Sequence, residues 1–289
     1  MWQAFVRAWI QQQVRQSASE ALRTAAQGQG ATPAEPARPC DVGVVFALGI
    51  EAGGFEDLLE GIVVTHAAGV KLHSGSLRRR GVVAIETGIG QLSAAAGTQA
   101  LIAGHKPAWV VSAGFAGGLD RRLKRGDIVM ADALVDGTGR RLAIDLKLDP
   151  AITANNKHLH VGACATTTNI LYRPEDKEAL GNQTGALAVD MESWAVGEVC
   201  RQAKTRFLNV RIISDAVDDA LPPDVEALAR QKTNAARFGA AAGAIFRRPS
   251  SIKDMLNLKQ DALVFSDRLA RFLAGVVEQL APPRREETA

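Results

Sequence analysis

The chain has few cysteines and few aromatic residues, and its opposite charges nearly cancel. Its three cysteines, Cys40, Cys164 and Cys200, form no C-x-x-C pair. That excludes a zinc ribbon or dithiol redox motif and predicts reduced thiols in a cytoplasmic compartment. No apolar run reaches the roughly 18 residues that a membrane-spanning helix needs. The composition, 47% hydrophobic and 22% charged over 289 residues, is that of a globular protein with a substantial core.

The net charge is +3, from 34 basic and 31 acidic residues, and it is unevenly distributed. The first forty residues hold four arginines and two glutamates and therefore carry +2, which leaves +1 for the rest of the chain. A body so closely balanced lacks the basic surface that binds nucleic acid, so we expect no nucleic-acid partner.

Several chemistries lack their sequence motif. There is no Walker motif and no H-E-x-x-H, and the glycines from Gly88 to Ser93 fall one residue short of G-x-G-x-x-G. His158 and His160 share one face of a possible strand, but no acid or thiol accompanies them at the spacing of a metal site. We therefore expect no metal and no cofactor.

Residues 1 to about 30 have the pattern of an amphipathic helix, and a linker follows up to residue 40. Apolar side chains from Trp2 to Val14 recur at i, i+3, i+4, i+7, i+8 and i+12 and form one stripe. Four interpretations stay open: an interfacial membrane helix, a targeting segment, a helix docked on a partner subunit, and a poorly ordered or mis-assigned extension. In the first, residues 2–14 make a peripheral membrane contact.

From residue 41 to about 220, short apolar runs alternate with helical patterns. Strands are expected at 42–48, 82–85, 109–111, 127–130 and 207–213, and helices at 91–104 and 191–203. The alternation predicts an α/β fold, a three-layer sandwich with a central mixed, mostly parallel sheet flanked by helices. Gly75 and Ser76 predict a hairpin turn. Residues 41–281 are expected to form one domain, with a helical C-terminal extension from about residue 222.

Polar residues stand where the expected strands end, which is the edge at which open α/β sheets bind ligands. They are Glu51, the turn 87–90, the glycine-rich segment 114–118, and the acidic segments 190–192 and 214–215. Each acid taken alone could be a helix cap or a surface carboxylate. Their common position at strand ends predicts that they share a pocket.

Four sequence blocks within residues 42–219 resemble the nucleoside phosphorylase and nucleosidase superfamily, of the purine and uridine phosphorylase type. The blocks are Val42–Glu51, Thr87–Gly90, Ser112–Leu119 with Lys124–Val129, and Ala188–Glu192 with Val210–Asp215. The greatest likeness is to methylthioadenosine/S-adenosylhomocysteine nucleosidases. The resemblance implies a phosphorylase-like fold and an enzyme that cleaves the N-glycosidic bond of an adenosine-type nucleoside. We also expect a homodimer or higher homo-oligomer.

Cleavage of a C1′–N bond creates an oxocarbenium-like sugar and a base anion. The base must therefore be protonated, the sugar cation stabilised and a nucleophile placed opposite. By resemblance, Asp215 is the general acid toward the purine N7 and is held by Ser214. Glu51 orients or deprotonates the attacking water. Arg211 and Thr87 are implied to lie near the nucleophile.

The resemblance also implies the substrate-binding surface. Glu192 would bind the ribose hydroxyls, and Met191 would pack against the sugar. Gly88, Gly117 and Ile170 are assigned to the same surface. Nucleosidases place an aromatic residue that stacks on the base after the middle strand, and here only Ile170 or Tyr172 stands there, since the segment 166–171 itself contains no aromatic ring.

The nucleophile is water or phosphate. Phosphorylases of this type place an arginine in the first glycine-rich loop, and the segment from Gly49 to Gly54 contains none. Glu51 in that loop would repel a phosphate. The sequence therefore favours hydrolysis, with phosphorolysis as the alternative. A non-catalytic nucleoside-binding protein is a second alternative, but the three acids of the implied mechanism are all present.

The C-terminal part adds a looser likeness. Ala244–Pro249 with Met255–Leu258, and Leu221–Pro223 before them, resemble the extension of hopanoid-associated phosphorylase-like proteins. That branch implies an adenosylhopane-type substrate. A membrane-dissolved substrate of this kind would give the amphipathic N-terminal segment a purpose.

Overall fold

The computed structural model describes residues 40–67, 70–146, 155–220 and 250–280, with side chains in the last range from Gln260 onward. The expected helix in residues 1–30 and the expected helical extension between residues 222 and 249 lie outside these ranges. The elements, in chain order, are β1 (Val42–Phe46), α2 (Gly49–Glu56), β2 (Glu60–Ala67), β3 (Val70–Leu77), β4 (Arg80–Glu86), α3 (Gln91–His105), β5 (Trp109–Gly118), β6 (Ile128–Val135), β7 (Arg141–Ala143), β8 (Leu159–Thr166), α5 (Pro174–Thr184), β9 (Ala188–Asp190), α6 (Ser193–Ala203), β10 (Arg206–Asp215) and α9 (Ser250–Leu280).

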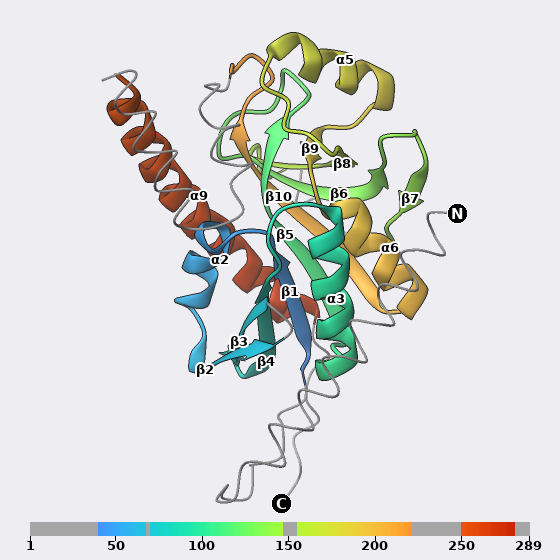
Figure 1. The fold of residues 1–289 in the computed structure, drawn as a ribbon, viewed down its shortest axis with the longest axis vertical. Helices are drawn as coiled ribbons and strands as arrows, with labels where there is room; N and C mark the ends of the chain where they lie inside the picture. The colour runs from blue at the N-terminus through green and yellow to red at the C-terminus, as the bar shows by residue number, and fades with distance from the viewer. Residues whose placement is uncertain (1–39, 68–69, 147–154, 221–249, 281–289) are drawn as a thin grey trace, which may run out of the picture.

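The strands form one mixed sheet, which confirms the predicted α/β class. Helices α2 and α9 pack together on one side of it, and α3 and α6 on the other (Figure 1). Strands β1, β4 and β5 pair in parallel at the centre, and β2, β3 and β4 form an antiparallel run to one edge. Toward the other edge β5, β10, β6, β8 and β9 pair in turn, and β9 pairs back to β5. These five strands thus close into a small barrel.

The central strands are buried on both faces, and their side chains divide between two cores. In β1, Val44 and Phe46 pack into the core beneath α2 and α9, whereas Val45 packs into the core beneath α3 and α6. The alternation follows from the two-residue period of a strand. It explains why continuous apolar runs, rather than alternating ones, identified these strands in the sequence.

The turn between β3 and β4 lies three residues later than expected. Gly75 and Ser76 are inside β3, and the turn is made by Arg78 and Arg79, whose φ values are 49° and 64°. A Cβ on Gly75 would lie 3.0 Å from the carbonyl oxygen of Glu60 on the neighbouring strand. The glycine therefore permits close packing of β2 on β3 and does not make the turn.

Candidate active site

A cavity of about 520 Å³ opens at the carboxyl ends of β1, β5, β9 and β10, and α9 closes one side of it. This is the edge of the sheet at which the sequence predicted a pocket. Seven of the ten predicted site residues line it: Glu51, Gly117, Ile170, Met191, Glu192, Ser214 and Asp215. The other three, Thr87, Gly88 and Arg211, are not among its lining residues.

Glu51 stands in the first turn of α2 and is held by backbone donors. Its Oε2 accepts hydrogen bonds from the nitrogens of Ala47 (3.1 Å) and Leu48 (2.9 Å), and its Oε1 accepts one from Phe115 (2.8 Å). A Cβ on Gly114 would lie 2.8 Å from Oε1, so a glycine is needed there. Burial raises the pKa of Glu51, and the backbone donors partly offset this. The side chain therefore joins the ends of β1 and β5 at the cavity.

Glu192 faces the cavity at the start of α6. Its Oε1 accepts a hydrogen bond of 2.6 Å from the nitrogen of Gly90, which has a φ of 97° and precedes α3. Burial, reinforced by the nearby charge of Asp190, raises the pKa of Glu192 to about 8. The Glu192 carboxyl group is thus mostly protonated at neutral pH and can then donate a hydrogen bond as well as accept one.

Asp190, in the cavity wall, forms a buried ion pair with Arg211, which lies behind the wall. The guanidinium Nε lies 2.7 Å from Asp190 Oδ2, and Nη2 donates to Ser112 Oγ at 2.7 Å and to Ser193 Oγ at 2.8 Å. Asp190 also accepts hydrogen bonds from Thr166 Oγ1 and from the nitrogen of Ser193. Arg211 does not line the cavity, and its donors are engaged in fixing the start of α6.

Thr87 and Gly88 lie behind the cavity wall, in the turn that leads to the lining residue Ile89. Thr87 is buried, and its Oγ1 lies 3.0 Å from the carbonyl oxygen of Gly88 and 3.2 Å from that of Phe46. The next residue, Ile89, lines the cavity. The turn from Thr87 to Gly90 thus contributes a backbone shape and the donor to Glu192, whereas the Thr87 hydroxyl stays inside the protein.

Asp215 closes β10 beside two partners, of which the sequence indicated one. Ser214 Oγ donates to Asp215 Oδ1 at 2.7 Å, as expected. Lys177, from α5, places its Nζ 2.5 Å from Asp215 Oδ2 and has no exposed surface. A single lysine in a helix carries no pattern that would have marked it as part of the site.

The apolar wall also contains residues that sequence reasoning missed. Phe115 from β5 and Phe265 from α9 both line the cavity, and their rings meet edge to face with centroids 6.5 Å apart. Arg125 lies over the Phe265 ring at 5.8 Å and pairs with Asp261 at 2.9 Å. The sequence likeness placed the aromatic contact in the segment 166–171, whereas the rings come from two other elements.

Two other titratable clusters lie away from this cavity. Asp127 bridges the two histidines that the sequence had left without an acid, at 2.8 Å from His158 and 3.2 Å from His160. Among the described residues, one group brings three potential metal ligands together: Glu56, His73 and Glu86. In it His73 contacts Glu56, and Lys71 pairs with Glu86 at 3.0 Å. In each cluster the carboxylates thus lie against an imidazole or a lysine of the protein.

A larger cavity of about 860 Å³ lies at the opposite, amino ends of β5 and β10. Its walls are formed by apolar side chains and three arginines, with Asp145 as the one acid among the described lining residues. It therefore lacks the convergent carboxylates of the cavity at the carboxyl ends, which we take as the candidate site.

Three solved structures that share this fold are named as nucleosidases or as a hydrolase. The 5′-methylthioadenosine/S-adenosylhomocysteine nucleosidase of Helicobacter pylori is 18% identical, with a TM-score of 0.64 over 83% of this chain and 99% of that chain. The corresponding enzyme of Colwellia psychrerythraea, solved with adenine, is 22% identical, with a TM-score of 0.60 over 84% and 97%. Futalosine hydrolase of H. pylori is 19% identical, with a TM-score of 0.60 over 83% and 99%.

The sequence comparison reaches the same family by a separate route. Residues 41–248 match the family described as the phosphorylase superfamily. That match spans well over half of the chain and includes all of the cavity carboxylates except Asp261, and it agrees with the sequence blocks that flank the cavity. The protein therefore belongs to the phosphorylase superfamily.

Proposed function

We propose that this protein hydrolyses the N-glycosidic bond of an adenosine-type nucleoside and releases the base. The observation that carries the proposal is the convergence of Asp215, Glu192 and Glu51 on one cavity at the carboxyl ends of the strands. Three separately held carboxyl groups match the three tasks of the reaction. These are to protonate the base, to bind the ribose and to direct the nucleophile.

Each role follows from the surroundings of the side chain. Asp215, next to Ser214, serves as the acid toward the leaving base. Glu192 can accept and donate hydrogen bonds, which suits a pair of ribose hydroxyls, and Met191 lies beside it in the cavity wall. Glu51 orients the attacking water. Phe115 and Phe265 provide an apolar surface for the nucleoside.

The charge of the cavity favours water over phosphate. Its described lining has five carboxyl groups, Glu51, Asp190, Glu192, Asp215 and Asp261, against two cations, Arg125 and Lys177. Each cation already pairs with a carboxylate, at 2.9 Å for Arg125 and 2.5 Å for Lys177. Asp190 is likewise paired, with Arg211 behind the wall, so a phosphate dianion would find no unpaired cation in the described lining, and Glu51 offers it no compensating charge. The solved relatives are themselves named nucleosidases or a hydrolase.

The fold alone does not select the substrate, since one relative is named for futalosine and the others for methylthioadenosine and S-adenosylhomocysteine. The test is a panel of purified nucleosides that includes adenosine, methylthioadenosine, S-adenosylhomocysteine, inosine and uridine, each with and without phosphate. We expect release of adenine and a free sugar in phosphate-free buffer. A strict requirement for phosphate, with a sugar 1-phosphate as product, would establish phosphorolysis instead. Binding without base release would establish a non-catalytic protein.

A further inference from the structure

Lys177 is a fully buried lysine whose three donors are all engaged at the candidate site. Its Nζ lies 2.5 Å from Asp215 Oδ2 and 2.9 Å from the carbonyl oxygens of both Ala216 and Asp219. An ammonium group has three N–H donors, so none is left for a substrate. Lys177 is also the one residue of α5 that is buried, so the helix directs this side chain inward.

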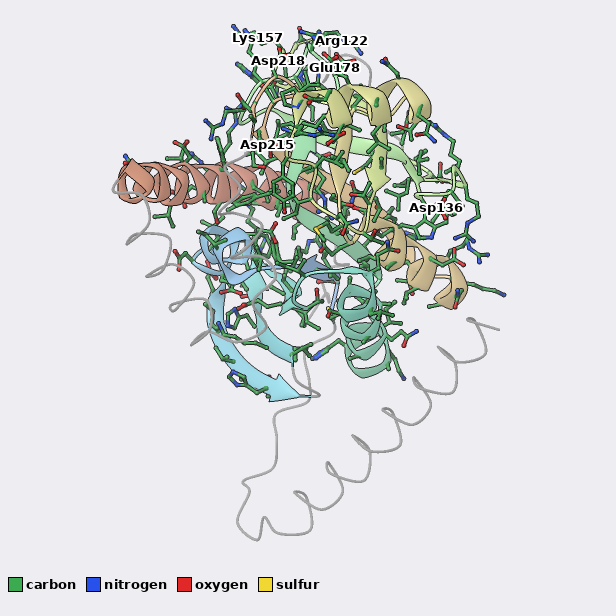
Figure 2. The ribbon with its side chains drawn as sticks, turned by 45° about the horizontal axis from the view of Figure 1, so that its top comes forward. Arg122, Asp136, Lys157, Glu178, Asp215 and Asp218 are labelled. Carbon is green, nitrogen blue, oxygen red and sulfur yellow. The ribbon has the colours of Figure 1, made fainter. Side chains whose placement is uncertain are left out.

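The pair is poorly explained as a device for stability alone. A buried ion pair loses the hydration of both charges, and apolar replacements of similar size are often as stable or more stable. Lys177 and Asp215 nevertheless both line the cavity, and the ammonium contacts the very carboxylate to which the proposed function assigns the proton transfer. In Figure 2 Asp215 is labelled below Glu178 and Asp218, and unlike Asp218 it is a buried residue.

The charged groups around the pair are few. Asp219 directs its carboxylate to the nitrogen of Ala216 at 2.8 Å and lies 3.9 Å from Arg125. Arg125 in turn pairs with Asp261 of α9, and its Nε donates to the carbonyl oxygen of Ser214 at 2.9 Å. Lys177 is therefore the one cation within hydrogen-bonding distance of the Asp215 carboxylate among the described residues.

We propose that Lys177 is a positioning residue that holds the proton Asp215 delivers to the leaving base. The N–H bond at Nζ breaks as an O–H bond forms on Asp215. That O–H bond breaks in turn as an N–H bond forms on the departing base. Asp215 ends as a carboxylate and Lys177 as a neutral amine. The attacking water loses one proton as it adds to the sugar, and after product release a proton returned through Asp215 restores the ammonium, so the cycle balances. This inference rests on the proposed function and deepens it.

The test compares Lys177→Met, Asp215→Asn and the double variant on two substrates. One is the nucleoside that the wild-type protein cleaves fastest, and the other is 4-nitrophenyl riboside, whose phenolate leaves without a proton. Lys177→Met should lower kcat on the nucleoside by about 100-fold, the usual scale for losing assisted proton transfer, with KM changed only a few-fold. Its rate on 4-nitrophenyl riboside should stay within a few-fold of wild type. Lys177→Arg keeps a cation but cannot release a proton, so it should not recover the loss. Glu178→Gln on the same helix is the matched control.

The double variant distinguishes an effect of Lys177 exerted through Asp215 from a general loss of structure. If Lys177 acts through Asp215, Lys177→Met/Asp215→Asn is no slower than Asp215→Asn alone. It also removes both charges, so it gives a folded protein even where Lys177→Met leaves a destabilising buried carboxylate. Any of three results would overturn the inference while the wild-type activity stands. The double variant could be slower than Asp215→Asn by the whole factor lost in Lys177→Met. Alternatively, Lys177→Met could lose the same factor on both substrates, or keep wild-type kinetics on the nucleoside. A wild-type protein that releases no base from any nucleoside would instead refute the proposed function, and the inference with it.

Discussion

The carboxyl group of Glu192 and the backbone nitrogen of Gly90 meet at 2.6 Å and join the start of α6 to the turn before α3. Gly90 has a φ of 97°, a conformation that glycine adopts without strain. The contact connects two segments about one hundred residues apart in the sequence and places a titratable group against the expected ribose site.

Glu192 should make the protein less stable as the pH rises. Its pKa is about 8 in the folded protein against 4.5 for an ordinary glutamate, so the folded state binds more protons than the unfolded state between these values. The free energy of unfolding should therefore fall across that window, by an amount on the order of a few kcal/mol.

Glu192→Gln should remove this part of the decline, because the amide keeps the oxygen that accepts from Gly90. Urea unfolding at pH 5.5 and pH 9 tests this. The variant should resemble the wild type at the lower pH and exceed it in stability at the higher one. Equal slopes against pH in the two proteins would show that Glu192 is not the titrating group.

Asp215→Asn should lower base release by about 100-fold or more without unfolding the protein. The amide has the same shape and retains an oxygen toward Lys177. Asp218→Asn is the control, because Asp218 lies three residues away with its side chain 65% exposed. Single-turnover base release and a thermal melt of each variant are the measurements. Near-wild-type turnover in folded Asp215→Asn would remove Asp215 from the role of acid.

Arg211→Met should destabilise the protein by about 3–5 kcal/mol, because it leaves the buried Asp190 carboxylate without its cation. Arg211→Met/Asp190→Asn should recover part of this loss, since the amide oxygen can still accept from Thr166 and Ser193. Urea titrations of both variants measure the difference. Asp190→Asn alone completes the comparison. If the double variant loses as much free energy of unfolding as Arg211→Met and Asp190→Asn lose together, the ion pair is not the reason that the fold needs Arg211.

Much of the site could be predicted from the sequence because parallel strands bring their carboxyl ends to one edge. Glu51, Glu192 and Asp215 met there as expected. Arg211 shows the limit of that reasoning: its position in β10 was predictable, but the direction of its side chain depends on Asp190 and Ser193, which belong to other elements. Lys177 and Phe265 come from helices with no motif, so tertiary packing alone places them in the cavity.

The elements of the fold show a similar division. The central strands and the helices α3 and α6 were predicted from apolar periodicity. The β3–β4 turn was misplaced because arginine is not a typical turn residue, yet Arg78 and Arg79 adopt left-handed φ values. No helix in the described part of the chain combines the length and the apolar character needed to cross a bilayer.

Deletion of residues 1–36 should leave activity on a soluble nucleoside within a few-fold of the full-length protein. Every described residue that lines the cavity lies at position 47 or later, and β1 begins at Val42. The same deletion should reduce co-sedimentation with anionic liposomes. It removes the apolar stripe between Trp2 and Val14, which contains two tryptophans, and it also removes two arginines that lie beside the stripe and could contact anionic lipid. A full-length protein that ignores liposomes, together with a deletion variant that misfolds, would instead place the stripe against the core or a partner subunit.

Phe265→Ala should weaken nucleoside binding while leaving the chemical step largely intact. The ring forms part of the cavity wall against Phe115, and α9 is fixed on α2 by the hydrogen bond from the nitrogen of Gly54 to Ser266 Oγ at 3.0 Å. Removing the ring should not move the carboxyl groups, because Glu51 and Asp215 are held by partners outside α9. KM should therefore rise about tenfold, equivalent to roughly 1.4 kcal/mol, with kcat changed much less.

The control for that variant is Leu263→Ala, two residues away on the same helix, where the side chain is 52% exposed and does not line the cavity. Steady-state kinetics of the two variants on the same nucleoside give the comparison. If Phe265→Ala and Leu263→Ala have the same KM, α9 covers the cavity without contacting the substrate. A fall in kcat that equals the rise in KM would mean that α9 also positions the catalytic carboxyl groups.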